Sequence, residues 1–164
     1  MIEIKKILFP TDFSEYSNHA LKYATALARN FQAKLYVVHV CEHPIAGGIE
    51  AYHFAIPEYV VDLEQHERKA LDSLIGELRN KGVDVEPVFL IGKAYQEIVK
   101  TAKNLEVDVI TMATHGSKGL SHLVFGSTAE KVVRLAPCPV LTVKHPEHDF
   151  VTEDQLVSDT SHLR

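Results

Sequence analysis

Five short apolar runs alternate along the chain with longer stretches in which apolar residues recur at helical spacing. The runs predict five strands: Ile4–Phe9, Leu35–Val40, Val83–Ile91, Val107–Met112 and Val140–Val143. Strands that alternate with helices pair in parallel, because each connection must return to the same end of the sheet through a crossover. The pattern therefore predicts an α/β fold, a three-layer α/β/α sandwich around a five-stranded parallel sheet.

Four helices are predicted between these strands: one after Pro10, one over residues 57–81, one over Ala94–Asn104 and one from Thr128. The first has an apolar face made of Ala20, Leu21, Ala24, Leu27, Ala28 and Phe31. The second has a stripe made of Leu63, Ala70, Leu71, Leu74, Ile75 and Leu78, and Gly82 is placed to end it. Pro87 lies inside the third strand and has no N–H to donate, so that strand is expected at an edge of the sheet.

The composition fits one globular domain and excludes several classes of protein. The chain has 164 residues, of which 46% are hydrophobic and 24% charged, and its formal net charge of −5 disfavours a nucleic-acid partner. The chain has two cysteines without CxxC spacing, a start without a leader-like apolar region and no apolar run of membrane length. These features predict a reduced, cytoplasmic protein with no membrane partner. The histidines form no HExxH pair, so no metal site is predicted.

Two segments do not fit the compact pattern. Residues 1–144 hold the predicted domain, whereas residues 145–164 form an acidic tail that we expect to be flexible. Residues 41–56 make a long connection that leaves the carboxyl end of the second strand. That connection is either a mobile lid over a ligand or a tolerated surface insertion, and the sequence leaves both open.

Two glycines mark the connection after the fourth strand. Ala113-Thr114-His115-Gly116 ends the strand, and Gly126-Ser127-Thr128 follows nine residues later at a helix start. A positive φ is expected at Gly116, and Gly126 lets a ligand approach the backbone. Such a loop binds phosphate through backbone N–H groups, with the hydroxyls of Ser127 and Thr128 and the ring of His115 nearby. Alternatively, Ser127 and Glu130 form a capping box.

Pro10-Thr11-Asp12-Phe13-Ser14 follows the first strand. Asp12 at that position can accept hydrogen bonds from a ribose or a base, or it can cap the helix that follows. If the first and fourth strands are neighbours, their carboxyl ends form a crevice at a topological switch point. Asp12 would then form one wall, and the glycine loop would form the other.

Several motifs, in this order, resemble the universal stress protein family over residues 2–144. They are Ile7-Leu8-Phe9-Pro10-Thr11-Asp12-Phe13-Ser14, Val38-His39-Val40, Ala113-Thr114-His115-Gly116 with Gly126-Ser127, Glu130-Lys131-Val132-Val133, and Ala136-Pro137-Cys138-Pro139-Val140-Leu141. The ATP-binding branch of that family has the pattern Gly-x2-Gly-x9-Gly followed by Ser or Thr. Gly116 and Gly126 match its second and third glycines, and Ala113 replaces the first.

The resemblance implies the strand order 3-2-1-4-5 and an ATP cofactor, with or without Mg²⁺. It implies that Asp12 and the Val40 backbone contact adenine or ribose, while Gly116, Gly126, Ser127 and Thr128 contact phosphates. The full predicted set is Pro10, Thr11, Asp12, Val40, Met112, Ala113, His115, Gly116, Gly126, Ser127 and Thr128. By contrast, His39 is expected to be a hydrogen-bonded core residue, and Cys138 a packed rather than reactive one.

The resemblance favours a nucleotide-dependent regulatory sensor in the stress response. It implies a homodimer through the 140–143 edge strand, and an unidentified protein partner would respond to the bound nucleotide. Two alternatives stay open: a nucleotide-free homodimeric interaction module, and a slow ATPase or self-phosphorylating protein. No P-loop and no GxSxG elbow is present, so no catalytic residue is predicted.

Overall fold

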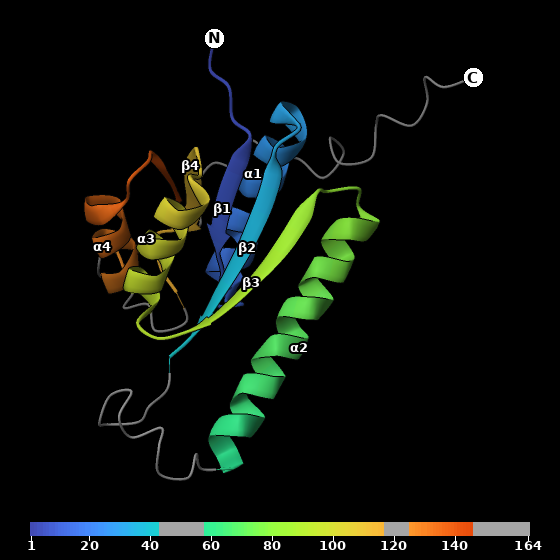
Figure 1. Cartoon of the computed structure of the whole chain (residues 1–164), viewed down its shortest axis with the longest axis vertical. Helices are drawn as coiled ribbons and strands as arrows, with labels where there is room; N and C mark the ends of the chain where they lie inside the picture. Colours follow the sequence, from blue (N-terminus) through green and yellow to red (C-terminus); the bar gives the residue numbers. More distant parts are fainter. Residues whose placement is uncertain (43–57, 117–124, 146–164) are drawn as a thin grey trace.

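The structure, a computed structural model, describes residues 1–42, 58–116 and 125–145. It contains a five-stranded parallel sheet of order β3-β2-β1-β4-β5, which confirms the predicted fold class and strand order (Figure 1). The strands are β1 (Lys6–Pro10), β2 (Lys34–Cys41), β3 (Val85–Ile91), β4 (Val109–Ala113) and β5 (Val140–Val143). The helices are α1 (Glu15–Phe31), α2 (Glu58–Asn80), α3 (Ala94–Leu105) and α4 (Ser127–Leu135).

Strand β1 pairs with β2 on one side and with β4 on the other. From β1 the chain winds outward through β2 and β3, and it then returns to build β4 and β5 on the opposite side. All five strands point the same way, so their carboxyl ends lie together at one end of the sheet. The strand order therefore reverses between β1 and β4, at the centre of that end.

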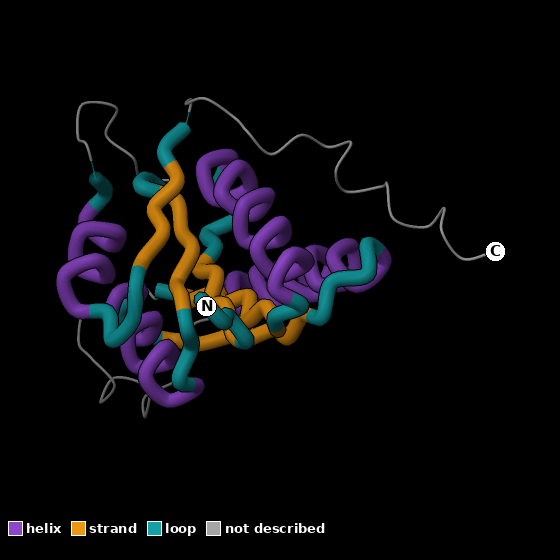
Figure 2. The backbone as a smooth tube through the Cα atoms, turned by 90° about the horizontal axis from the view of Figure 1, so that it is seen from above, coloured by secondary structure: helices purple, strands orange, loops and turns teal. Residues whose placement is uncertain are grey.

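Helices cover both faces of the sheet (Figure 2). Helices α1 and α2 pack on one face against alternate strand residues such as Ile7, Phe9 and Val37. Helices α3 and α4 pack on the other face against the intervening residues, including Leu8 and Val38. Because side chains along a strand alternate between faces, the same strands supply both hydrophobic layers.

Details of the element ends differ from the sequence prediction. Pro10 does not stop β1 but is its last residue and pairs with Val38, since a strand end does not require the missing N–H. Phe31, predicted on the apolar face of α1, is 39% exposed, because the helix ends there and Gln32 turns the chain with φ of 53°. The expected helix stop is confirmed, as Gly82 has φ of 73° and its N–H donates to the Arg79 carbonyl.

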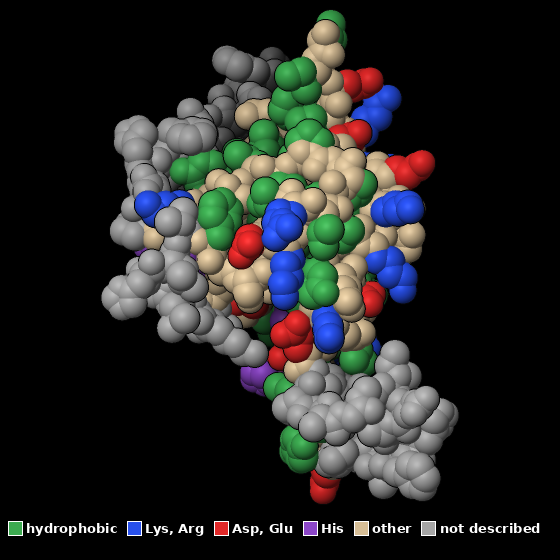
Figure 3. Space-filling model, turned by 90° about the vertical axis from the view of Figure 1, so that its left-hand side faces the viewer, with side chains coloured by type: hydrophobic (Ala, Val, Ile, Leu, Met, Phe, Trp, Pro, Cys, Tyr) green, Lys and Arg blue, Asp and Glu red, His purple; other side chains and the backbone are tan. Residues whose placement is uncertain are grey.

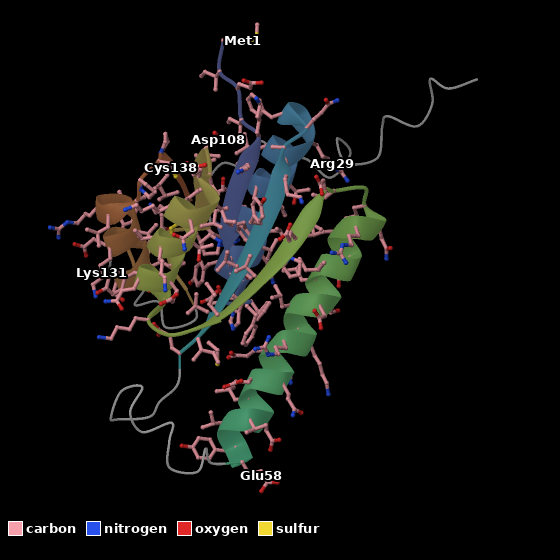
Figure 4. The ribbon with its side chains drawn as sticks, viewed as in Figure 1. Met1, Arg29, Glu58, Asp108, Lys131 and Cys138 are labelled. Atoms are coloured by element: carbon pink, nitrogen blue, oxygen red, sulfur yellow. The ribbon has the colours of Figure 1, made fainter. Side chains whose placement is uncertain are left out.

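Asp108 fixes the register of β1 against β4 at the amino-terminal end of the sheet. Its Oδ2 accepts hydrogen bonds from the N–H groups of Lys5 (2.7 Å) and Lys6 (2.8 Å). The Asp108 N–H in turn donates to the Lys6 carbonyl at 2.9 Å. Figure 4 shows Asp108 at this amino-terminal end of the sheet, away from the carboxyl ends where the candidate site lies. In the part of the chain that the structure describes, no helix is both long and apolar enough to cross a membrane.

Gly76 lies in the middle of α2, and no neighbouring atom lies within 4 Å of the position that a Cβ would occupy. Alanine there keeps the helix and reduces the conformational freedom of the unfolded chain. Gly76→Ala should therefore raise the free energy of unfolding by about 0.5–1 kcal/mol. Chemical denaturation followed by circular dichroism measures it, and a lower midpoint would contradict the packing of α2 described here.

Candidate functional site

The carboxyl ends of β1 and β4 bring Asp12 and Gly116 into contact. A Cβ placed on Gly116 would lie 2.5 Å from Oδ2 of Asp12 and 3.5 Å from its Cγ. The first and fourth strands are therefore neighbours, as the predicted crevice required, and its two walls meet at these residues. Residues 117–124 of the glycine loop lie outside the described residues.

Glycine is needed at position 116 for a reason that the sequence did not show. The prediction of a positive φ there is wrong, because the described glycines with positive φ are Gly82 and Gly92. Instead, the Asp12 carboxylate occupies the space that a side chain at 116 would take. A Cβ contact as short as 2.5 Å is repulsive, so any other residue would displace the carboxylate.

Helix capping and the position of Asp12 are compatible. Ser14 is the N-cap of α1, and its Oγ accepts a hydrogen bond from the Ser17 N–H at 3.2 Å. Asp12 holds the turn before it, since its Oδ1 accepts from the Ser14 N–H at 3.1 Å. The Asp12 side chain is exposed, with Oδ2 directed at Gly116. The carboxylate is thus fixed at the mouth of the crevice rather than used up as the helix cap.

The residues on either side of Asp12 are held from within the protein. Phe13 has φ of 61°, a left-handed conformation that costs a non-glycine residue about 1 kcal/mol. Its N–H donates to Oγ1 of Thr11 at 3.0 Å, and that hydroxyl also lies 3.0 Å from Oγ of Ser17. Thr11 is buried and donates its own N–H to the Val38 carbonyl at 2.9 Å. Thr11, predicted as a ligand contact, therefore supports the turn that presents Asp12.

Gly126 begins the second wall of the crevice. It is the N-cap of α4, and its carbonyl accepts the first helical hydrogen bond, from the Glu130 N–H at 3.0 Å. Its own N–H donates to the Thr114 carbonyl at 2.7 Å, which ties the helix start to the end of β4. A Cβ at 126 would lie 3.2 Å from that carbonyl oxygen, so the close approach favours glycine.

The capping-box alternative for Ser127 is wrong, because Ser127 is the first residue of α4 rather than its N-cap. Ser127 is exposed and Thr128 half-buried at this helix start. The first-turn N–H groups of a helix have no acceptor within the helix itself. With the helix dipole, they make this wall suited to an anion.

The other predicted contacts divide into core and surface. The side chains of Met112 and Ala113 are 5% and 7% exposed and belong to the two opposite core layers. The methyl group of Ala113 therefore packs in the core instead of projecting into the crevice. Pro10 and Val40 are half-buried at the ends of β1 and β2.

His115 lies beside Gly116 at the end of β4. Its Nδ1 is 3.0 Å from Oγ1 of Thr114, and its ring centroid lies 5.9 Å from that of Tyr16 on α1. The side chain is half-buried. His115 thus lies beside Gly116 and contacts Thr114 at the end of β4 and Tyr16 of α1.

The sequence prediction missed the surroundings of His39. As expected, His39 is a buried, hydrogen-bonded residue of β2, but its partners reach the site. Its ring contacts the Thr11 carbonyl on one side and Glu67 of α2 on the other. Glu67 lies on the helix face that also carries the buried Val60, Leu71 and Ile75. A glutamate within the apolar stripe of this helix was the sequence signal that could have pointed to a buried polar partner such as His39.

Comparison with known proteins decides the family. The family model described as the universal stress protein family matches residues 3–144. A universal stress protein of Methanocaldococcus jannaschii is 35% identical over 147 residues, covering 88% of this chain and 85% of that protein. The chain belongs to the universal stress protein family.

Solved structures share the fold of this universal stress protein. A universal stress protein of Lactobacillus plantarum superposes with a TM-score of 0.75 at 21% identity, over 87% of this chain and 99% of that one. A universal stress protein of Archaeoglobus fulgidus, solved in complex with dAMP, gives a TM-score of 0.62 at 22% identity. That match covers 88% of this chain and all (100%) of the other.

The described residues contain no group of three His, Cys, Asp or Glu side chains that could hold a metal ion. The two cysteines do not form a disulfide and are poor nucleophiles. Burial and, after it, the Glu67 carboxylate raise the pKa of the Cys41 thiol to about 12. Burial also raises the pKa of the Cys138 thiol, which fits the prediction of a packed residue.

Cys41 should resist alkylation in the folded protein. At pH 8 a thiol with a pKa of about 12 is almost entirely protonated, whereas an ordinary cysteine is partly thiolate. Iodoacetamide should therefore modify Cys41 about a thousandfold more slowly in the native protein than in denaturant. Mass spectrometry of the quenched reaction measures both rates, and comparable rates would contradict the burial of this thiol.

Proposed function

We propose that this universal stress protein binds an adenine nucleotide, ATP above all, in the crevice between β1 and β4. The observation that carries the proposal is the contact of Gly116 with the Asp12 carboxylate, at the end of β4 to which Gly126 ties the start of α4. One wall thus offers a fixed anionic acceptor, and the other offers backbone donors. A nucleotide has both complementary parts, since ribose hydroxyls donate hydrogen bonds and phosphates accept them.

The described residues fit the two ends of such a ligand. The exposed Asp12 carboxylate would accept from ribose, with the half-buried Val40 nearby at the end of β2. Gly126, Ser127 and Thr128 would hold phosphate oxygens through N–H groups and hydroxyls at the start of α4. The family member solved with dAMP supports this assignment, because it shares the fold and holds an adenine nucleotide.

The proposed role is that of a regulatory sensor. Binding that joins the two walls would favour one arrangement of the loops and so change the surface offered to a protein partner. Any Mg²⁺ would arrive with the nucleotide phosphates, since the described residues contain no separate group of metal ligands. The nucleotide-free interaction module and the slow ATPase remain the competing functions.

A homodimer through β5 is part of the proposal. β5 is an edge strand, and Thr114 N–H donates to the Val143 carbonyl, so the backbone groups of Thr142 face away from β4. Leu141, Val133 and Leu135 are exposed by 40%, 44% and 56%. Figure 3 shows hydrophobic side chains among lysines and arginines on the face covered by α3 and α4. An unpaired edge beside exposed apolar side chains favours pairing with a second copy.

Nucleotide binding is tested by denaturing the purified protein, identifying any released nucleotide by chromatography and titrating ATP into the stripped protein by calorimetry. Gly116→Ala should weaken ATP binding by about tenfold, because its methyl group displaces the Asp12 carboxylate. Ala113→Gly should change the affinity less than about threefold, since that methyl group lies in the core.

Gly76→Ala serves as the folding control, because it lies on α2 away from the crevice. Absence of both released nucleotide and binding heat would contradict the proposed function and leave the interaction module. Magnesium-dependent release of phosphate from ATP would instead favour the slow ATPase.

The dimer is tested separately with Thr142→Pro, which removes the outward N–H of the edge strand. The variant should elute and scatter light as a monomer, whereas Thr142→Val, which keeps the N–H, should stay dimeric. Circular dichroism confirms that both variants are folded. A dimeric Thr142→Pro protein would contradict pairing through β5.

A further inference from the structure

His39 contacts both neighbours of Asp12 without lying in the crevice itself. Its Nδ1 is 2.8 Å from the Thr11 carbonyl oxygen, and its ring centroid lies 4.5 Å from that of Phe13 at an angle of 31°. The imidazole is 5% exposed, so these contacts are rigid and sheltered from water. His39 therefore supports the strained turn at Phe13 from below and fixes the backbone that carries Asp12.

The other side of the ring is held by helix α2. Nε2 of His39 lies 3.0 Å from Oε2 of Glu67, and the two side chains are 6% and 23% exposed. Glu67 also raises the pKa of the neighbouring Cys41 thiol, which is buried. A largely buried carboxylate is stable only when donors surround it, so Glu67 depends on this arrangement as His39 does.

Proton positions in this pair follow from its partners. A carbonyl oxygen only accepts, so Nδ1 must carry a proton and donate to Thr11. Nε2 faces a carboxylate oxygen, and a hydrogen bond there needs a second proton between the two groups. The chain thus runs from Glu67 through the ring to the Thr11 carbonyl, and it transmits a displacement at either end.

We propose that His39 and Glu67 form a positioning pair that couples the docking of α2 to the geometry of Asp12. The inference rests on the proposed function, because it gives that nucleotide site a regulatory element. α2 packs chiefly on β2 and β3, and the His39–Glu67 contact adds a polar link between the helix and the turn after β1. By linkage, a nucleotide held by Asp12 stabilises the docking of α2, and a partner that moves α2 weakens nucleotide binding.

Three variants separate the two ends of the link. The amide nitrogen of asparagine can replace Nδ1, so His39→Asn keeps the bond to Thr11 and loses the one to Glu67. Glutamine places its nitrogen near Nε2, so His39→Gln keeps the bond to Glu67 and loses the one to Thr11. Glu67→Leu removes the carboxylate from the apolar stripe, and Glu77→Leu, at an exposed glutamate of the same helix, is the control.

The first experiment needs no nucleotide. Hydrogen exchange of the amides in residues 11–18 should be about tenfold faster in Glu67→Leu and His39→Gln than in the wild type and Glu77→Leu, because the turn has lost its support. His39→Asn, which also loses the bond to Glu67, should exchange as fast there as Glu67→Leu. Thermal unfolding confirms that each variant is folded. Wild-type exchange in both Glu67→Leu and His39→Gln would overturn the proposal.

The second experiment adds ATP. Wild-type protein should show slower exchange in residues 58–80 of α2 when ATP is bound, and this response should be lost in His39→Asn and Glu67→Leu. If wild-type protein binds ATP without any change in α2, the coupling is overturned while the proposed function stands. If it binds no nucleotide, the proposed function fails and the exchange in residues 11–18 alone decides whether the pair positions the turn.

Discussion

Strands β1 and β4 pair at the centre of the sheet, and the chain leaves this pair toward opposite edges. Their adjacency brings Asp12 from one loop within contact distance of Gly116 from the other, although more than a hundred residues separate them along the chain. The side chain missing at Gly116 leaves room for the carboxylate. The arrangement of the crevice therefore depends on this one pairing, which Asp108 secures at the far end of the sheet.

The residues around the crevice hold the turn that carries Asp12 in place. Ser14, and not Asp12, caps α1. Thr11 and His39 support the turn from inside, which lets Phe13 keep its left-handed conformation. A strained residue next to an exposed carboxylate is stable only where its neighbours hold it in place. The strained residue thus lies next to Asp12, the proposed ligand contact, where the turn fixes the position of the carboxylate.

The order and type of the elements were predictable from the sequence, whereas the individual side-chain contacts between elements were not. The alternation of apolar runs predicted the parallel sheet, and Pro87 and Gly82 predicted an edge strand and a helix end. The reason for glycine at 116 lies in a residue from another loop, so no local rule could supply it. Ser127 was interpreted as a possible helix cap because Glu130 follows it three residues later. The same spacing also occurs between two residues that both lie inside a helix, as these do in α4. Glu67 interrupts the apolar stripe of α2, but the sequence alone does not show that its partner is His39 of β2.

The proposed nucleotide site is the crevice between β1 and β4, with Asp12 and the start of α4 on its two sides. A two-dimensional ¹H–¹⁵N NMR titration of the full chain with ATP tests it most directly, because each backbone amide reports its own surroundings. We expect the largest shifts on Phe13, Gly116 and residues 126–128. Absence of shifts at millimolar ATP, or shifts confined to the outer faces of α3 and α4, would contradict it.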